Sequence, residues 1–439
     1  MKILNLSGSK LTDKTLGDLF HRASAAFQSL EDLDLSCNRI GVESIKSTTT
    51  ALIKSPSSGL WCLDLSHNSP EVSELQALED AVRGGSLPNL RELNLRGSLT
   101  SDADINGSLL EALSFHCPLL GELSLSQNNL GVPEISALAR IISQHRNVVS
   151  HSPRDGTPNL ISAGFRPQQF NLNLDTTKLS DKGLSTFIES LESPCHFREL
   201  HLKGNGIHAT GVSCLTGSTC LGKIVMQGAL SLLCLDDNPL GLEGTVAIGR
   251  MLSSSHCQLR QVTLSRCQLT TAGGGLPNTN CPNLDYNVTS EVVRDVGQQL
   301  CQMPQNNTIK WLYLDGNSFT GEGIYVLAGF MYLCPCLDKL SSSHCRITSD
   351  DLEQILDKLA QIKVSSPSVC YKLMCWNLSN NEIDDSGVSV LLDHLPLLFP
   401  NLDYTPIIGV FLYDNPVSSE MMRRMNEEME RRSKVRCYE

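Results

Sequence analysis

Few residues of this sequence have the types and spacing that catalysis or cofactor binding requires. The segment from Gly217 to Lys223 matches G-x-x-x-x-G-K, the spacing of a phosphate-binding loop. Such a loop continues with Ser or Thr to hold magnesium, whereas this chain continues with Ile224. The segment also lacks a strand before it and a helix after it. We therefore expect no nucleotide site here, and the sequence predicts no cofactor.

Cysteine and histidine do not follow a metal-binding pattern either. The chain has 17 cysteines, an odd number, and no C-x-x-C pair. Cys37 and His67 occupy equivalent positions in neighbouring segments, with Asp34 and Asp64 nearby. We interpret this grouping as a polar surface. The sequence therefore predicts reduced thiols, no metal site and no catalytic constellation, so we expect a protein that is not an enzyme.

Acidic and aromatic residues at alternating positions suggest a different chemistry, the binding of another protein. Carboxylates gather in the amino-terminal half and aromatic side chains in the carboxy-terminal half. Carboxylates can steer a basic partner, and exposed Trp and Tyr side chains are enriched in binding hot spots. The predicted partner-binding residues are Asp32, Asp34, Asp64, Glu92, Glu122, Trp311, Tyr313, Asp315, Phe411, Tyr413 and Asp414.

A repeated leucine pattern must position these residues. The segment LEDLDLSCNRI has apolar residues at Leu30, Leu33, Leu35 and Ile40 and an amide at Asn38. The pattern recurs thirteen times, mostly 28 to 30 residues apart. The copies start at Met1, Leu30, Leu60, Leu90, Leu120, Gln169, Phe197, Leu230, Leu259, Ile309, Leu337, Leu373 and Ile407.

Each copy predicts a short strand followed by a helix. The two leucines of L-x-L point to one face of a strand, and the residues between them point to the other face. Strands of successive copies can pair in parallel only if a helix forms the return connection. Helix-start signals follow the strands, for example at Thr12, Ser180, Thr320 and Asp384. The recurrent Asn is expected to satisfy main-chain groups where the chain leaves the strand.

The pattern L-x-x-L-x-L-x-x-N-x-L resembles the leucine-rich repeat family, and its period is similar to that of the ribonuclease-inhibitor subtype. The resemblance implies an α/β solenoid, a horseshoe with a parallel concave sheet and convex helices. We expect residues 1–417 to form about 13 repeats with insertions near 145–169 and 271–288. The second insertion has an alternative interpretation, a degenerate extra repeat from Leu284.

The two ends of the array differ. Residues 418–439 predict a strongly charged amphipathic helix that caps the last repeat. Met1 lies within the first strand motif, so the amino-terminal edge has no predicted cap. We expect that edge to be covered by an upstream region or by the packing of another chain.

Charge and hydropathy exclude several classes of partner. The chain has 35 Lys and Arg against 47 Asp and Glu, a formal net charge of −12. This charge disfavours nucleic acid and anionic membranes as main partners. No window approaches 18 consecutive apolar residues, and the amino terminus has no leader pattern. The sequence predicts a soluble cytoplasmic protein, with a cytoskeletal association left open.

The function predicted from these features is a noncatalytic scaffold that binds a protein partner on its concave face, as a subunit of a larger cytoplasmic or cytoskeletal assembly. Two alternatives stay open. The last repeat is similar to the end of the ribonuclease inhibitor family, which implies ribonuclease contacts for Tyr413 and Asp414. The fold also resembles Ran GTPase-activating proteins, but those have an acidic tail, whereas this chain ends in a basic segment from Arg431 to Arg436.

Overall fold

A computed structural model describes most of the chain, and contacts between residues divide it into two units. The first unit comprises Met1–Asn205 and Thr219–Leu230, and the second comprises Gly206–Ser218 and Ser231–Glu439. The described residues are 1–22, 29–41, 45–46, 48, 59–68, 72–144, 170–191, 197–216, 230–255, 257–271, 290–366, 369, 371, 373–398 and 409–434.

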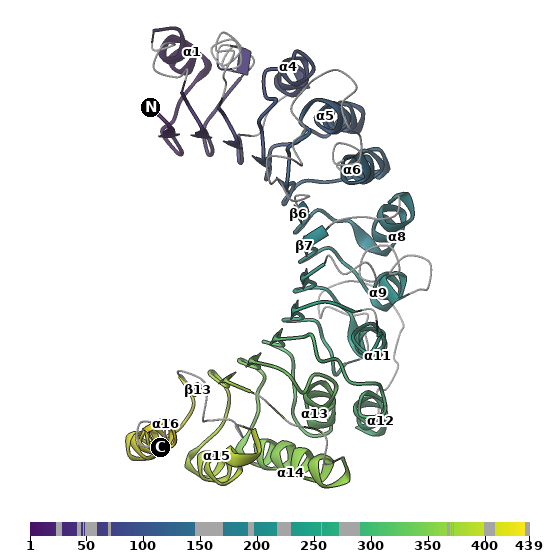
Figure 1. Cartoon of the computed structure of the whole chain (residues 1–439), viewed down its shortest axis with the longest axis vertical. Helices are drawn as coiled ribbons and strands as arrows, with labels where there is room; N and C mark the ends of the chain where they lie inside the picture. The colour runs from purple at the N-terminus through teal and green to yellow at the C-terminus, as the bar shows by residue number, and fades with distance from the viewer. Residues whose placement is uncertain are drawn as a thin grey trace, which may run out of the picture. The chain divides into compact units, whose positions relative to one another are not determined.

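Thirteen strands follow one another in chain order in an open parallel sheet, which confirms the predicted α/β repeat architecture. In the first unit, helices α1, α4, α5, α6 and α8 lie on one side of the strands (Figure 1). Its strands are β1 (Ile3–Asn5), β2 (Asp32–Asp34), β3 (Cys62–Asp64), β4 (Glu92–Asn94), β5 (Glu122–Ser124), β6 (Phe170–Asn173) and β7 (Phe197–His201). Its helices are α1 (Asp13–Arg22), α4 (Val72–Arg83), α5 (Ala103–His116), α6 (Val132–Gln144) and α8 (Ser180–Ser190).

The second unit repeats the same two layers (Figure 1). Its strands are β8 (Leu232–Cys234), β9 (Gln261–Thr263), β10 (Trp311–Tyr313), β11 (Lys339–Ser341), β12 (Cys375–Asn377) and β13 (Gly409–Phe411). Its helices are α9 (Ala209–Thr216), α11 (Gly241–Leu252), α12 (Ser290–Leu300), α13 (Gly323–Leu333), α14 (Ser349–Ser365), α15 (Asp385–Leu398) and α16 (Ser419–Lys434).

The leucine spacing explains which side chains face the helices. Leu33, Leu63 and Leu93 are in register as the central residues of β2, β3 and β4, and all three are buried. The residues on either side of each central leucine point to the opposite face, because side chains alternate along a strand. We call this second face, which points away from the helices, the open face of the sheet.

Asparagine side chains bind the turns that follow the strands. The amide nitrogen of Asn128 donates to the carbonyl oxygens of Leu95 (2.9 Å) and Leu125 (2.8 Å), and its Oδ1 accepts from the Leu99 amide (2.9 Å). One side chain thus joins two successive turns in a buried setting, as the sequence predicted. Equivalent bonds between neighbouring turns are made by Asn38, Asn68, Asn205, Asn317, Asn381 and Asn415.

Other copies have a different residue in place of the asparagine, and the Ser98 hydroxyl donates to the carbonyl oxygen of Leu65 in the preceding repeat at 2.8 Å. The Thr177 hydroxyl donates to the carbonyl oxygen of Leu174 within its own turn at 2.9 Å. The thiols of Cys267 and Cys345 donate to the carbonyls of the preceding repeats, at 3.1 Å and 3.4 Å. Weaker donors therefore occupy the same place in the fold.

Helix starts agree with the sequence at some positions and differ at others. The Asp384 carboxylate accepts from the amides of Ser386 and Gly387 at the start of α15, as a capping residue does. The prediction of a cap at Ser180 is wrong. Leu179 is the N-cap of α8 and makes no side-chain cap bond, and Ser180 has a φ of 58°.

Several predicted features lie outside the described residues. These are the insertion at 145–169, nearly all of the insertion at 271–288, the alternative repeat from Leu284 and the loop from Gly217 to Lys223. Helix α16 occupies most of the predicted cap at 418–439, and its Met425 is buried. The extent of the solenoid, 1–417, stays a prediction.

Removal of one asparagine amide is expected to destabilise the fold. Asn128→Ala leaves buried main-chain groups of two turns without partners, which should lower the free energy of unfolding by about 2–4 kcal/mol. Urea denaturation followed by circular dichroism measures this change. The matched control is Asn129→Ala, because Asn129 is adjacent and exposed. Equal stability of the two variants would contradict the structural role of Asn128.

Candidate functional site

The open face of the first unit has a row of acidic residues. The register aligns Asp32 of β2, Cys62 of β3, Glu92 of β4 and Glu122 of β5 across four neighbouring strands. Adjacent parallel strands lie about 4.8 Å apart, so Glu92 and Glu122 are close neighbours. We call Asp32, Glu92 and Glu122 the acidic row. In the described part of the chain none of these three carboxylates forms an ion pair.

The proximity of these carboxylates affects their protonation. Partial burial raises the pKa of the Glu92 carboxyl, and the negative charges of Glu122 and Asp32 raise it further. Burial and the charges of Asp32 and Glu92 raise the pKa of the Cys62 thiol to about 12. Cys62 therefore stays a neutral thiol between two acids. The sequence analysis did not single out Cys62, although alignment of the repeats places it in this row.

Asp34 and Asp64 lie one row further along and have structural partners. Asp34 accepts from the Ser36 amide (2.9 Å) through Oδ1 and from Asn5 Nδ2 (2.8 Å) through Oδ2. Asp64 accepts from the Ser66 amide and from an asparagine amide in the same way, both at 2.8 Å. These two predicted site residues thus stabilise the turns after β2 and β3, and fewer of their lone pairs are available to a partner.

The open face of the second unit exposes aromatic side chains. Trp311 on β10 is 47% exposed, although tryptophan is usually largely buried. Tyr313, two residues on, is half-buried on the same face. The ammonium group of Lys339 on β11 lies 5.1 Å from the centre of the Tyr313 ring, a cation–π contact. The sequence predicted the two aromatic residues but not Lys339, which is adjacent only because β10 and β11 pair.

One carboxylate oxygen of Asp315 accepts three hydrogen bonds from its neighbours. Its Oδ1 accepts from the Ser341 hydroxyl (2.6 Å), the Ser343 amide (2.8 Å) and the Ser343 hydroxyl (2.9 Å). This predicted site residue therefore links the ends of β10 and β11.

The last strand presents the remaining predicted residues. Phe411 and Tyr413 are 39% and 67% exposed, and their rings stack with centroids 6.0 Å apart. Asp414 is also exposed, on a turn with a φ of 54°. Thus the structure brings Phe411 and Tyr413 together and leaves both rings accessible.

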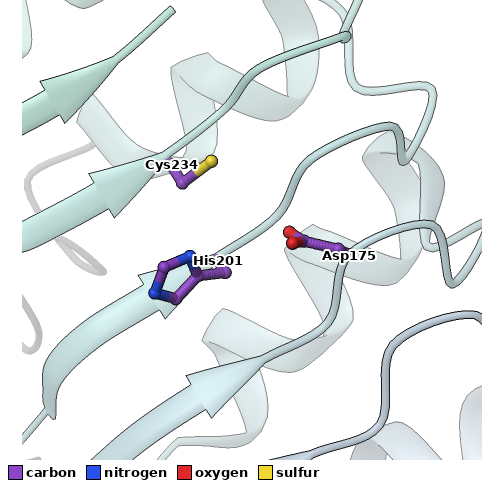
Figure 2. Close-up of side chains that lie close together, drawn as sticks. All are labelled: Asp175, His201 and Cys234. Carbon is purple, nitrogen blue, oxygen red and sulfur yellow. The ribbon is translucent and has the colours of Figure 1, made fainter. Parts of the chain in front are cut away.

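Side chains with metal-binding atoms also lie near strand ends (Figure 2). Asp175 follows β6 and His201 ends β7, both in the first unit, and their ligand atoms lie within 4.8 Å of each other. The carboxylate of Asp175 already accepts from the Lys203 amide (2.8 Å). Cys234, also drawn in Figure 2, ends β8 of the second unit.

Two further findings concern the cysteine thiols and the apolarity of the helices. The twelve cysteines in the described part of the chain are free thiols. No described helix contains the apolar 18-residue stretch that a membrane span requires.

Comparison with known proteins identifies related repeats. The Leucine Rich repeat family matches residues 28–47, 193–215 and 369–392. The human NACHT, LRR and PYD domains-containing protein 5 is 25% identical over 441 residues, which cover 91% of this chain and 33% of that protein. The ribonuclease inhibitor of Sus scrofa is 27% identical over 327 residues, which cover 63% of this chain and 68% of the inhibitor.

The chain spans a third or less of the length of the first NACHT, LRR and PYD relatives. Among solved structures, the leucine-rich repeat-containing protein LegL7 from Legionella pneumophila has a TM-score of 0.41 and 18% identity. This match covers 72% of this chain and 85% of LegL7.

Neutralisation of Glu92 is expected to stabilise the protein near neutral pH. The pKa of this carboxyl is raised in the folded state, so its charged form costs stability at pH values above that pKa. The cost disappears below the usual glutamate pKa of about 4.3, where folded and unfolded chains are both protonated. Glu92→Gln should therefore raise the urea midpoint at neutral pH and leave it unchanged in acid.

The control for this measurement is Glu111→Gln. The Glu111 carboxylate accepts from Arg140 at 2.9 Å, so its neutralisation removes an ion pair and should give no stabilisation. An equal rise in the midpoint for both variants would show that repulsion within the acidic row is not the cause.

Proposed function

Because this chain is a leucine-rich repeat protein whose repeats are similar to those of ribonuclease inhibitor, we propose that it is a noncatalytic scaffold that holds a protein partner on the open face of its sheet. The observation that carries the proposal is Trp311, which is 47% exposed on a strand of that face. A partner that covers this indole removes a large apolar surface from water.

The surroundings of Trp311 support the same role. The ammonium group of Lys339 lies 5.1 Å from the centre of the Tyr313 ring, a contact that favours one orientation of the ring before any partner arrives. Ordered aromatic side chains lose little conformational entropy on binding, which is one reason that they form hot spots. In this proposal Phe411 and Tyr413 supply further aromatic contacts.

The charged residues have two different roles in this proposal. The acidic row of Asp32, Glu92 and Glu122 steers a basic region of the partner toward the first unit, because its charges have no ion-pair partners among the described residues. Asp34, Asp64 and Asp315 hold the turns that present this face. Asp414 adds an exposed charge beside Tyr413.

The setting that we propose is a multi-subunit cytoplasmic assembly, and a cytoskeletal setting stays a prediction.

Loss of the exposed aromatic residues is expected to release the partner. The double variant Trp311→Ala, Tyr313→Ala should reduce recovery of the bound protein at least about tenfold, since truncation of a hot spot costs about 2 kcal/mol or more. Affinity capture with quantitative mass spectrometry identifies the bound protein, and titration of the purified pair measures the affinity.

The matched control is Phe115→Ala. Phe115 is 61% exposed but lies on helix α5, away from the open face. Its loss should leave recovery unchanged. Equal recovery with the double variant and the wild type would exclude the open face around Trp311 as the binding surface.

The similarity to ribonuclease inhibitor favours a second candidate, inhibition of a basic ribonuclease by way of the exposed Tyr413 and Asp414. The scaffold proposal expects the purified chain to leave the activity of a pancreatic-type ribonuclease unchanged, with porcine ribonuclease inhibitor as the positive control. Inhibition that disappears in Tyr413→Ala would establish the second candidate instead.

The Ran-type GTPase-activating alternative stays a prediction, and a GTP hydrolysis assay tests it.

A further inference from the structure

Two pairs of aromatic side chains lie on the open face of the second unit. The first pair is Trp311 and Tyr313 of β10, and the second is Phe411 at the end of β13 and Tyr413 in the turn after it. Trp311, Phe411 and Tyr413 are exposed, and Tyr313 is half-buried. The register joins Tyr313 to Phe411 in one row across β11 and β12. The two aromatic pairs therefore lie three strands apart on the same face.

The two strands between the aromatic pairs have mostly short side chains on this face. Ser341 of β11 is 2% exposed, and Cys375 and Asn377 of β12 are half-buried. We call these three the central residues. The fourth side chain, that of Lys339, is longer, and its ammonium group lies over the Tyr313 ring. Aromatic rings thus flank two strands whose central residues are shorter than the rings.

The polar groups of the central residues bond to one another and to their neighbours. Asn377 Nδ2 donates to the Ser341 hydroxyl (3.1 Å), which donates to Asp315 Oδ1 (2.6 Å). Asn377 Oδ1 accepts from the Ser379 amide (3.1 Å). Cys375 is a free thiol. A partner can therefore cover these residues without supplying new hydrogen bonds, so the cost of removing them from water is small.

The separation of the aromatic pairs matches the width of an α-helix. Three strand spacings of about 4.8 Å place the main chains of Tyr313 and Phe411 about 14 Å apart. An α-helix with its side chains is about 10–12 Å wide, so it can lie along β11 and β12 with one aromatic pair on each side. Helix residues four apart rise by about 6 Å. The ring centroids of Phe411 and Tyr413 are 6.0 Å apart, so two such residues can face the two rings.

Lys339 indicates the charge of the helix that fits. It is the charged side chain among the open-face residues of β10 to β13. In the described part of the chain it contacts the Tyr313 ring and forms no ion pair. Asp338, its neighbour in sequence, lies 3.6 Å from the ammonium group of Lys310 instead. An acidic side chain at the edge of the helix would therefore find an available cation.

We propose that the second unit binds an amphipathic α-helix of a partner protein, which lies along β11 and β12 between the two aromatic pairs. Its apolar face contacts the rings, and an acidic side chain at the edge of that face pairs with Lys339. The proposal rests on the proposed scaffold function and specifies the secondary structure and chemistry of the partner. An extended segment binds through its main chain to the edge of a sheet, whereas this face offers side chains, as helix-binding surfaces do.

The test uses the full chain and labelled peptides of about 18 residues, held helical by a side-chain lactam bridge because short isolated helices are marginal in water. The first peptide has leucines on one face and glutamates at the edges of that face. The second has a proline at its centre, and the third has lysines in place of the glutamates. Fluorescence anisotropy measures the affinities. We expect the proline peptide to bind at least about tenfold more weakly than the first, because proline breaks a helix. The lysine peptide should bind about threefold or more weakly.

Variants of the chain then locate the helix. Trp311→Ala and Phe411→Ala should each weaken binding of the first peptide about tenfold, because the helix contacts both aromatic pairs. Cys375→Trp adds a large ring between the pairs and leaves both intact, and it should weaken binding about tenfold or more by a clash with the helix. The matched control is Cys214→Trp, which adds the same ring on helix α9, where Cys214 is also half-buried. Circular dichroism confirms that each variant is folded.

A charge reversal tests the role of Lys339. Lys339→Glu should weaken binding of the glutamate peptide about tenfold and strengthen binding of the lysine peptide. The matched control is Lys358→Glu. Lys358 also lies over a tyrosine ring, that of Tyr325 at 5.6 Å, but on helix α14. This control makes the same change in net charge and should alter binding less than about twofold.

Three results would overturn the inference. The first is a helical peptide that does not bind saturably, or binds no more tightly than the proline peptide. The second is binding that Cys375→Trp or Phe411→Ala leaves unchanged. The third is binding of the glutamate peptide that Lys339→Glu does not weaken. Capture of the natural partner that still depends on Trp311 would then keep the scaffold function without the helix. Loss of Trp311 dependence in partner capture would remove the scaffold function as well.

Discussion

A buried asparagine amide, bonded to the main chain of two successive turns, is the contact on which the described repeats depend. Each strand has only three to five residues, so the ladder between strands ends quickly and leaves amides and carbonyls at the turn. Without a partner each such buried group costs free energy. Asn128 satisfies three of them and joins two repeats. Where the amide is absent, Thr177, Cys267 and Cys345 donate from the same place.

This constraint separates the two faces of the sheet. The leucines must face the helices, because they form the buried interior, and the residues between them must then face outward. Chemistry on the open face can vary while the repeat is kept. Some outward residues are nevertheless required by the turns, as Asp34, Asp64 and Asp315 show through their bonds to main-chain amides and hydroxyl groups. The outward residues that remain, such as Trp311 and Glu92, are those available to a partner.

The charge on each part of the open face depends more on which side chains form ion pairs or hydrogen bonds there than on the net charge of the chain. In the first unit, the acidic row leaves carboxylates close together without cations, and the pKa of Glu92 is raised as a result. In the second unit, Asp338 lies 3.6 Å from the ammonium group of Lys310, one oxygen of Asp315 accepts from serine donors, and Lys339 lies over the Tyr313 ring. Each unit thus presents its own electrostatic character, which a sum over 439 residues does not convey.

The sequence by itself determined the number of strands, the buried leucines, the asparagine positions and the outward placement of Trp311 and Tyr313, because strand alternation is a local property with a fixed period. It did not determine which carboxylates are free, that Cys62 separates two acids, or that Lys339 covers Tyr313. Ser180 also looked like a cap and is not one. These outcomes depend on register between strands about thirty or more residues apart, and only the tertiary structure brings such residues within hydrogen-bonding and Coulombic distance.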